Sequence, residues 1–161
     1  MLLPAVAGAV FALAVLLIAG SRPLAVRTAS VDAPNQLTIA TLHPGQAVCE
    51  GPITSQGATR SVGIWGAAAG ATARLTVAVK DASTQATVAS GSLQAVAQEG
   101  EWTARLGQDV PQGHPVQICL TQDAGAFSLM GSAVSEPGVT VTGIPAGQRY
   151  SLVLLSDGDQ S

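Results

Sequence analysis

Charged and aromatic side chains are scarce in this chain of 161 residues, and both shortages narrow the functions open to it. Only 11% of the residues are charged, and lysine occurs once, as Lys80. Two of the 7 basic residues, Arg22 and Arg27, follow an N-terminal apolar run. The remainder of the chain therefore has 5 basic and 10 acidic residues and is net acidic. Because a nucleic-acid-binding face must be basic to neutralise phosphates, we expect no nucleic-acid partner.

Motifs of nucleophilic catalysis are also missing. The chain has no Gly-x-Ser-x-Gly sequence, and His43 and His114 each lie beside a proline in an expected turn, where structural histidines are common. Glu99 and Glu101 have a spacing that would suit a glycosidase pair, but a solvated turn is the simpler interpretation. We therefore expect no enzyme, no catalytic residue and no cofactor.

Metal binding is only slightly better supported. Loop carboxylates hold a structural calcium in many β-sandwich domains, but no calcium-loop spacing is present, so we expect no metal site. If calcium were bound, the candidate ligands would be Asp81, Asp109, Asp123, Asp157 and Asp159.

One long apolar run is present, over residues 2–20, and it carries no charge. As a helix it would be about 28 Å long, which is close to the hydrocarbon thickness of a bilayer. It predicts either a membrane anchor or a signal peptide, and the poor small-x-small cleavage motif after it favours the anchor. We expect residues 1–21 to form this segment, residues 22–35 a tether, and residues 36–161 the folded domain. If residues 1–29 were cleaved, the domain would be secreted.

The only two cysteines, Cys49 and Cys119, each follow a Pro/Gly turn and lie within an apolar stretch. These matched contexts predict partner strands joined by a disulfide, and therefore an oxidising compartment. The positive-inside rule, applied to Arg22 and Arg27, would instead leave the domain in the cytoplasm. We give the cysteines more weight, because two arginines are a weak bias, and expect a membrane-anchored extracytoplasmic domain. The alternative is two reduced, buried thiols.

Alternation of apolar and polar residues dominates the remainder of the chain. In residues 73–80, for example, Leu75, Val77 and Val79 share one face of a strand. About ten such short stretches recur at roughly 8–12-residue spacing, and no amphipathic helix is evident after Gly20. This pattern predicts an all-β fold, a two-sheet sandwich of jelly-roll type.

Glycan binding would need a flat aromatic face with polar groups at its rim, and aromatics make up only 3% of the chain. The ligand-binding candidates are Trp65, Trp102 and Tyr150. We favour Trp65, because Gly63 and Gly66 beside it would leave its ring unobstructed. The simpler interpretation is that Trp102 belongs to the core and Trp65 is half-buried.

Residues 42–50, Leu-His-Pro-Gly-Gln-Ala-Val-Cys-Glu, and residues 116–120, Val-Gln-Ile-Cys-Leu, carry a resemblance to a known class of domain. Over about residues 36–155 the chain resembles the extracytoplasmic β-sandwich modules of actinobacterial multi-span membrane proteins, including glycosyltransferase-like envelope proteins. It departs from them in having one expected span, so it lacks the membrane portion that would hold a transferase site. The resemblance implies a sugar-related or accessory role at the cell envelope.

Three functions are compatible with these patterns. The first is an anchored module that binds an envelope glycan or has an accessory role at the cell envelope, with residues 2–20 in the lipid bilayer. The second is a structural or protein-interaction module that partners a multi-span membrane protein, which predicts buried tryptophans and an apolar surface patch. Residues 152–155 would then serve either the core or that patch. The third, a hydrolase, would need carboxylates gathered in a pocket.

Overall fold

A computed structural model describes residues 25–31, 37–132, 139–145 and 147–157. Within these ranges the chain forms strands and turns and no helix, which confirms the all-β prediction. No helix of this part is long and apolar enough to cross a membrane, and the expected anchor at residues 2–20 lies outside it. The strands are β1 (Ala25–Val31), β2 (Leu37–Leu42), β3 (Ala47–Thr54), β4 (Thr59–Ala68), β5 (Thr72–Asp81), β6 (Thr87–Val96), β7 (Gly100–Val110), β8 (Pro115–Ala124), β9 (Phe127–Ser132), β10 (Thr140–Thr142), β11 (Arg149–Tyr150) and β12 (Leu152–Asp157).

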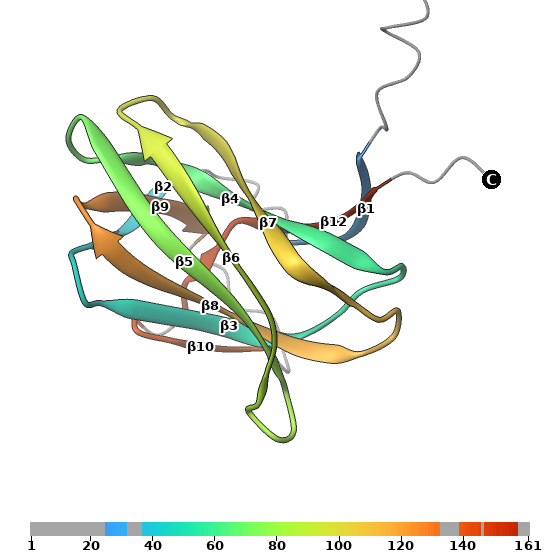
Figure 1. The fold of residues 1–161 in the computed structure, drawn as a ribbon. Coiled ribbons are helices and arrows are strands. Elements are labelled where there is room, and N and C mark those ends of the chain that lie inside the picture. The colour runs from blue at the N-terminus through green and yellow to red at the C-terminus, as the bar shows by residue number, and fades with distance from the viewer. Residues whose placement is uncertain (1–24, 32–36, 133–138, 146, 158–161) are drawn as a thin grey trace, which may run out of the picture.

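All strand pairs are antiparallel, and hydrogen bonds link the strands into one curled sheet (Figure 1). The main path runs β1-β12-β4-β7-β6-β5-β8-β3-β10. The sheet branches at β4, because residues 61–64 pair with β12 whereas residues 66–68 pair with β9. β9 in turn carries β2 and β11. A division of these strands into the two sheets of a jelly-roll sandwich stays a prediction.

The curl brings the apolar faces of the strands together around one core. Leu75, Val77 and Val79 of β5 are at most 1% exposed, while Thr76 and Ala78 between them face outward and are half-buried. The alternation expected for this strand is therefore confirmed. Burial of such side chains contributes roughly 1.5–3 kcal/mol each, so the core is the main source of stability.

The predicted disulfide is confirmed. Cys49 of β3 and Cys119 of β8 lie directly opposite each other, with their Cα atoms 4.0 Å apart and an S–S bond of 2.02 Å. Neighbouring residues Val48 and Leu120 point into the core, so the bond lies on the outer face of the sheet. It closes a loop with a sequence separation of 70, which the chain-entropy model values at about 4 kcal/mol.

The prediction that residues 22–35 form a tether is wrong for Ala25–Val31, because these seven residues form strand β1. β1 pairs with β12, and the register places Ala25 opposite Asp157 and Val31 opposite Leu152. The absence of a helical period in residues 22–35 favours a tether. A short edge strand, however, needs no such period, and forms wherever a neighbouring strand offers backbone groups for hydrogen bonds. The apolar strand β12 supplies that partner.

Candidate functional site

The three aromatic residues predicted to bind a ligand do not lie together. Tyr150 is fully buried, and its hydroxyl donates a 2.6 Å hydrogen bond to the carbonyl oxygen of Ile118. Burial raises the pKa of this phenol, and the nearby Glu50 carboxylate raises it further. The ring of Tyr150 has no access to solvent, so its predicted role as a binding platform is wrong.

Trp65 and Trp102 lie on opposite faces of the sheet. Trp102 pairs with Ile64 and packs against the core, and its indole N–H donates a 3.0 Å hydrogen bond to the carbonyl oxygen of Gly66. Trp65 pairs with Glu101 on the outer face and is half-buried. Of the three aromatic candidates, Trp65 alone presents its ring outside the core.

The glycines beside Trp65 do not act as predicted. A Cβ on Gly63 would lie 2.6 Å from Glu101 Oε1 and 2.6 Å from Val153 Cγ1, so those side chains already fill the space above this glycine. Gly66 faces inward, and a Cβ there would overlap the ring of Phe127. Both glycines therefore permit close packing and do not clear an approach to Trp65.

What the sequence did not reveal is a polar row that runs beside Trp65 on β7. The register places Glu101 opposite Trp65, Thr103 opposite Gly63 and Arg105 opposite Ser61. Thr103 and Arg105 are exposed, and the Glu101 carboxylate lies over Gly63. A partly exposed indole ring thus has a carboxylate, a hydroxyl and a guanidinium arranged along one side. The alternation of β7 contains this row, but only the strand register shows that it borders Trp65.

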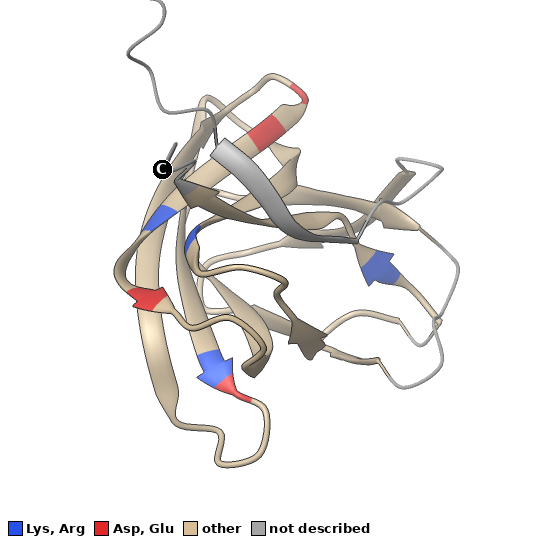
Figure 2. Ribbon diagram, turned by 90° about the vertical axis from the view of Figure 1, so that its right-hand side faces the viewer, with Lys and Arg blue, Asp and Glu red and all other residues tan. Residues whose placement is uncertain are grey.

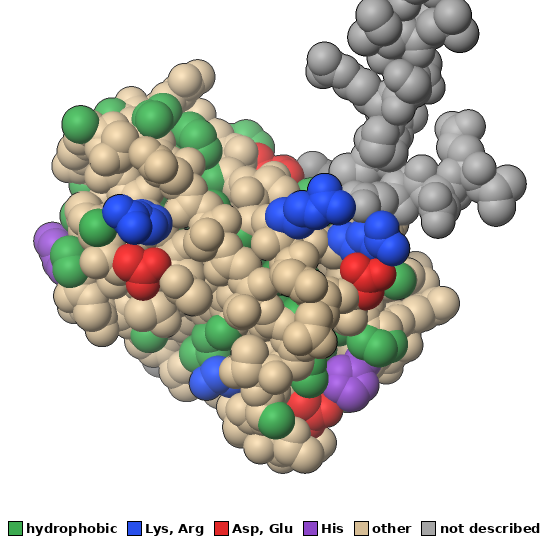
Figure 3. Space-filling view, viewed as in Figure 1, with side chains coloured by type: hydrophobic (Ala, Val, Ile, Leu, Met, Phe, Trp, Pro, Cys, Tyr) green, Lys and Arg blue, Asp and Glu red, His purple; other side chains and the backbone are tan. Residues whose placement is uncertain are grey.

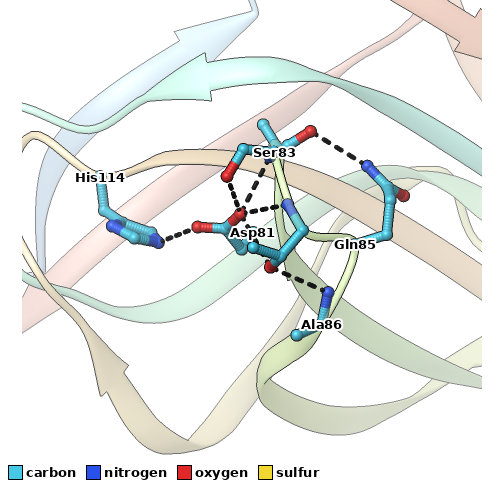
Figure 4. A network of polar contacts seen from close by, with 7 residues as sticks. Asp81, Ser83, Gln85, Ala86 and His114 are labelled. Carbon is cyan, nitrogen blue, oxygen red and sulfur yellow. Dashed lines mark hydrogen bonds and ion pairs between the residues drawn. The ribbon is translucent and has the colours of Figure 1, made fainter.

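A second polar cluster surrounds Asp81, the last residue of β5, where the chain turns toward β6 (Figure 4). Its Oδ1 accepts hydrogen bonds from the Ser83 hydroxyl at 2.6 Å and amide at 2.9 Å, and from the Thr84 amide at 2.6 Å and hydroxyl at 3.0 Å. These bonds, the Ser83 hydroxyl first, hold the pKa of Asp81 well below its usual value. Residues 81–84, Asp-Ala-Ser-Thr, include side chains that bond their own backbone in turns, so the sequence alone predicts this turn.

His114, the residue before β8, completes this cluster, with its Nε2 atom 2.8 Å from Asp81 Oδ2. The Ser83 hydroxyl donates to the carboxylate and not to the imidazole. Nucleophilic catalysis needs a hydroxyl bonded to a base that a third group orients. Asp81, Ser83 and His114 therefore stabilise the turn and are not arranged as a catalytic triad.

Three of the aspartates considered for calcium, Asp81, Asp109 and Asp123, bond to other protein groups, while Asp159 and the side chain of Asp157 lie outside the described part. Asp109 accepts a 2.9 Å hydrogen bond from Arg60, and Asp123 accepts one of 2.8 Å from Thr76. Throughout the described ranges, no three His, Cys, Asp or Glu side chains gather in a metal-binding group. Charged residues are sparse and spread over several strands (Figure 2), and on the face in Figure 3 acidic side chains lie next to basic ones.

Comparison of the chain with protein-family models and with curated proteins finds no match. The interpretation of the Trp65 surface therefore rests on its chemistry. A half-exposed ring offers an apolar plane, and the row on β7 offers hydrogen-bond donors and acceptors beside it.

Proposed function

We propose that the chain is a non-catalytic module on the extracytoplasmic side of a membrane, and that it binds an envelope glycan on the outer face of β4 and β7. The observation that carries this proposal is the position of Trp65, which lies outside the core and directly opposite Glu101. Sugar C–H groups stack on an aromatic plane, while their hydroxyls need hydrogen-bonding groups at its rim. Glu101 and Thr103 supply such groups.

The disulfide supports the proposed compartment. Disulfides persist in oxidising surroundings and are rare in the reducing cytosol. Together with an uncharged apolar run at residues 2–20, the Cys49–Cys119 bond favours a domain held at the outer surface of a membrane. We further propose that the curled sheet is a two-sheet sandwich, with β4 and β7 in one layer and β3, β5 and β8 in the other.

A protein-interaction module is the second candidate, and the surface gives it less support. It predicts an apolar patch, for which residues 152–155 were considered, but those four residues are 1%, 3%, 1% and 9% exposed. In the described part of the chain the exposed large hydrophobic residues are Leu37 and Val96, which lie on β2 and β6. Single exposed apolar residues are common on soluble domains and do not mark an interface.

A glycan array probed with the full chain in detergent micelles tests the proposal. The wild-type protein should be retained on a subset of envelope-type glycans, and Trp65→Ala should lose that retention. Because Trp65 lies outside the core, its truncation should cost well under the roughly 3–5 kcal/mol typical of a buried tryptophan. Trp102→Phe, which leaves the outer face unchanged, is the matched control and should keep retention. If Trp65→Ala is retained as well as the wild type, the site is elsewhere and the proposal fails.

A further inference from the structure

A groove of about 270 Å³ opens away from the Trp65 surface, where β3, β8 and β10 meet the turn between β5 and β6. Its lining residues are Gly51, Pro52, Ala82, Gln85, Gln117 and Thr140. Gln117 faces outward, because its neighbours Val116 and Ile118 both point into the core. On the main path of the sheet, β6 and β5 lie between β7 and β8 (Figure 1), and no lining residue of the groove belongs to β4 or β7, so the groove and the Trp65 surface are separate.

An irregularity of β3 forms the floor of the groove. The register of β3 against β8 shifts between Glu50 and Ile53, so Gly51 and Pro52 are the bulged residues. A Cβ on Gly51 would lie 2.8 Å from the Gln117 Cα atom, and only a glycine allows β3 to approach β8 this closely. Bulges of this kind redirect side chains and are common next to functional sites.

The rim of the groove is held in place by hydrogen bonds. The Ala82 amide donates to the carbonyl oxygen of Pro115 at 3.0 Å, which fixes the turn to the start of β8. Gln85 has a positive φ of 61°, and its side-chain amide donates to the carbonyl oxygen of Ala82 at 3.2 Å. The Asp81 cluster holds the same turn from its other side (Figure 4). Such a rim needs little reorganisation to receive a ligand.

Two polar side chains in the groove are available to a ligand. Within the described part of the chain, neither the Gln117 amide nor the Thr140 hydroxyl makes a side-chain hydrogen bond. The amide offers donors and an acceptor, and the hydroxyl offers both. None of the lining residues is charged, and the exposed ring of Pro52 adds an apolar surface. This lining lacks a counter-charge for an ion and suits a neutral molecule that carries several hydroxyls.

We propose that this groove is a second binding subsite, which takes one neutral sugar unit through Gln117, Thr140 and the ring of Pro52. This proposal rests on the glycan-binding function given above and extends it. The volume is slightly below the roughly 300 Å³ at which pockets for drug-sized ligands begin, so the groove accommodates one unit and not an oligosaccharide. With Trp65 on a different surface, one module would contact glycan at two separate places.

The test follows the Gln117 side-chain amide and the Thr140 backbone amide by NMR in the full chain in detergent micelles. The probes are glucose, N-acetylglucosamine and arabinose, each at about 50 mM, well above a dissociation constant of about 1 mM. At least one sugar should shift both signals. Gln117→Met and Thr140→Val should each weaken that binding by about three- to tenfold, the effect of one lost hydrogen bond. Gln94→Met, at an exposed position on β6 outside the groove, is the matched control and should bind as the wild type does.

The same titration on Trp65→Ala separates this proposal from the proposed function. Groove shifts that persist in Trp65→Ala support an independent subsite. A response of Trp65 in the wild type without any shift at Gln117 overturns the groove proposal and leaves the function intact. No response at either place overturns both. A neutral tripeptide that shifts Gln117 when no sugar does would assign the groove to a peptide, and would also overturn the proposal.

Discussion

Glu50 and Arg149 form an ion pair inside the core, although 99 positions of sequence separate them. The Arg149 Nε and Nη2 groups each lie 2.8 Å from Glu50 Oε1, and the Tyr150 amide donates to Glu50 Oε2 at 3.0 Å. Glu50 is on β3, near one end of the main path of the sheet, whereas Arg149 is on β11, which lies off this path and pairs with β9. This pair, together with the bond from the Tyr150 hydroxyl to β8, closes the curl of the sheet.

Removal of one partner of this pair should destabilise the protein strongly. Arg149→Met leaves the Glu50 carboxylate in the core without its cation, which should lower the free energy of unfolding by about 3–5 kcal/mol. In the double variant with Glu50→Leu no charge remains buried, so it should be more stable than Arg149→Met alone. Urea unfolding followed by circular dichroism measures both. A double variant less stable than Arg149→Met would show that Glu50 stabilises the core without Arg149, through its bond from the Tyr150 amide, and would contradict this expectation.

Asp81 should make stability depend on acid pH. Its folded pKa lies below the usual 3.8, so its contribution is complete above the unfolded value of about 3.8 and is lost as the pH falls through the folded value. Asp81→Asn should therefore lower the melting temperature at neutral pH, and the difference from the wild type should narrow as the pH falls below about 3.8. Thermal melts between neutral pH and strong acid measure this difference. If the difference in melting temperature between Asp81→Asn and the wild type stays constant over that range, the charge of Asp81 does not contribute to stability.

Gly91 should tolerate no side chain. β6 and β7 pair only at Gly91–Leu106 and Ser92–Arg105, and a Cβ on Gly91 would overlap the carbonyl oxygen of Arg105. Gly91→Ala should cost about 1–3 kcal/mol, the usual effect of overpacking. Gly100→Ala is the control, because a Cβ there would meet no atom within 4 Å, and it should leave the melting temperature nearly unchanged. Equal melting temperatures for the two variants would contradict the close approach of β6 to β7 at Gly91.

The parts of this structure that the sequence predicted are those encoded locally. The alternation at Leu75 and Val77 depends on the period of a single strand, and the turn at Asp81 depends on neighbouring side chains. The disulfide was predictable because only two cysteines in similar strands were available to pair.

Features that depend on which strands lie together were not predictable. The Glu50–Arg149 pair exists because β11 reaches β3, and no local pattern specifies that approach. The sequence likewise does not say that Trp65 and Trp102 face opposite sides, because this follows from the register of β4 against β7. The same register filled the space above Gly63 with Glu101, so the glycine could not clear the ring as predicted.

The indole N–H signals of the two tryptophans test the central claim most directly, because the chain contains only Trp65 and Trp102. The full chain in detergent micelles would be titrated with a glycan that the array retains, and both signals would be followed by NMR. The Trp65 signal should move in a saturable way, since its ring lies on the outer face beside Glu101. The Trp102 signal should stay in place, because its N–H is bonded to Gly66 and its ring packs against the core. A Trp65 signal that stays still while the glycan binds would contradict the account.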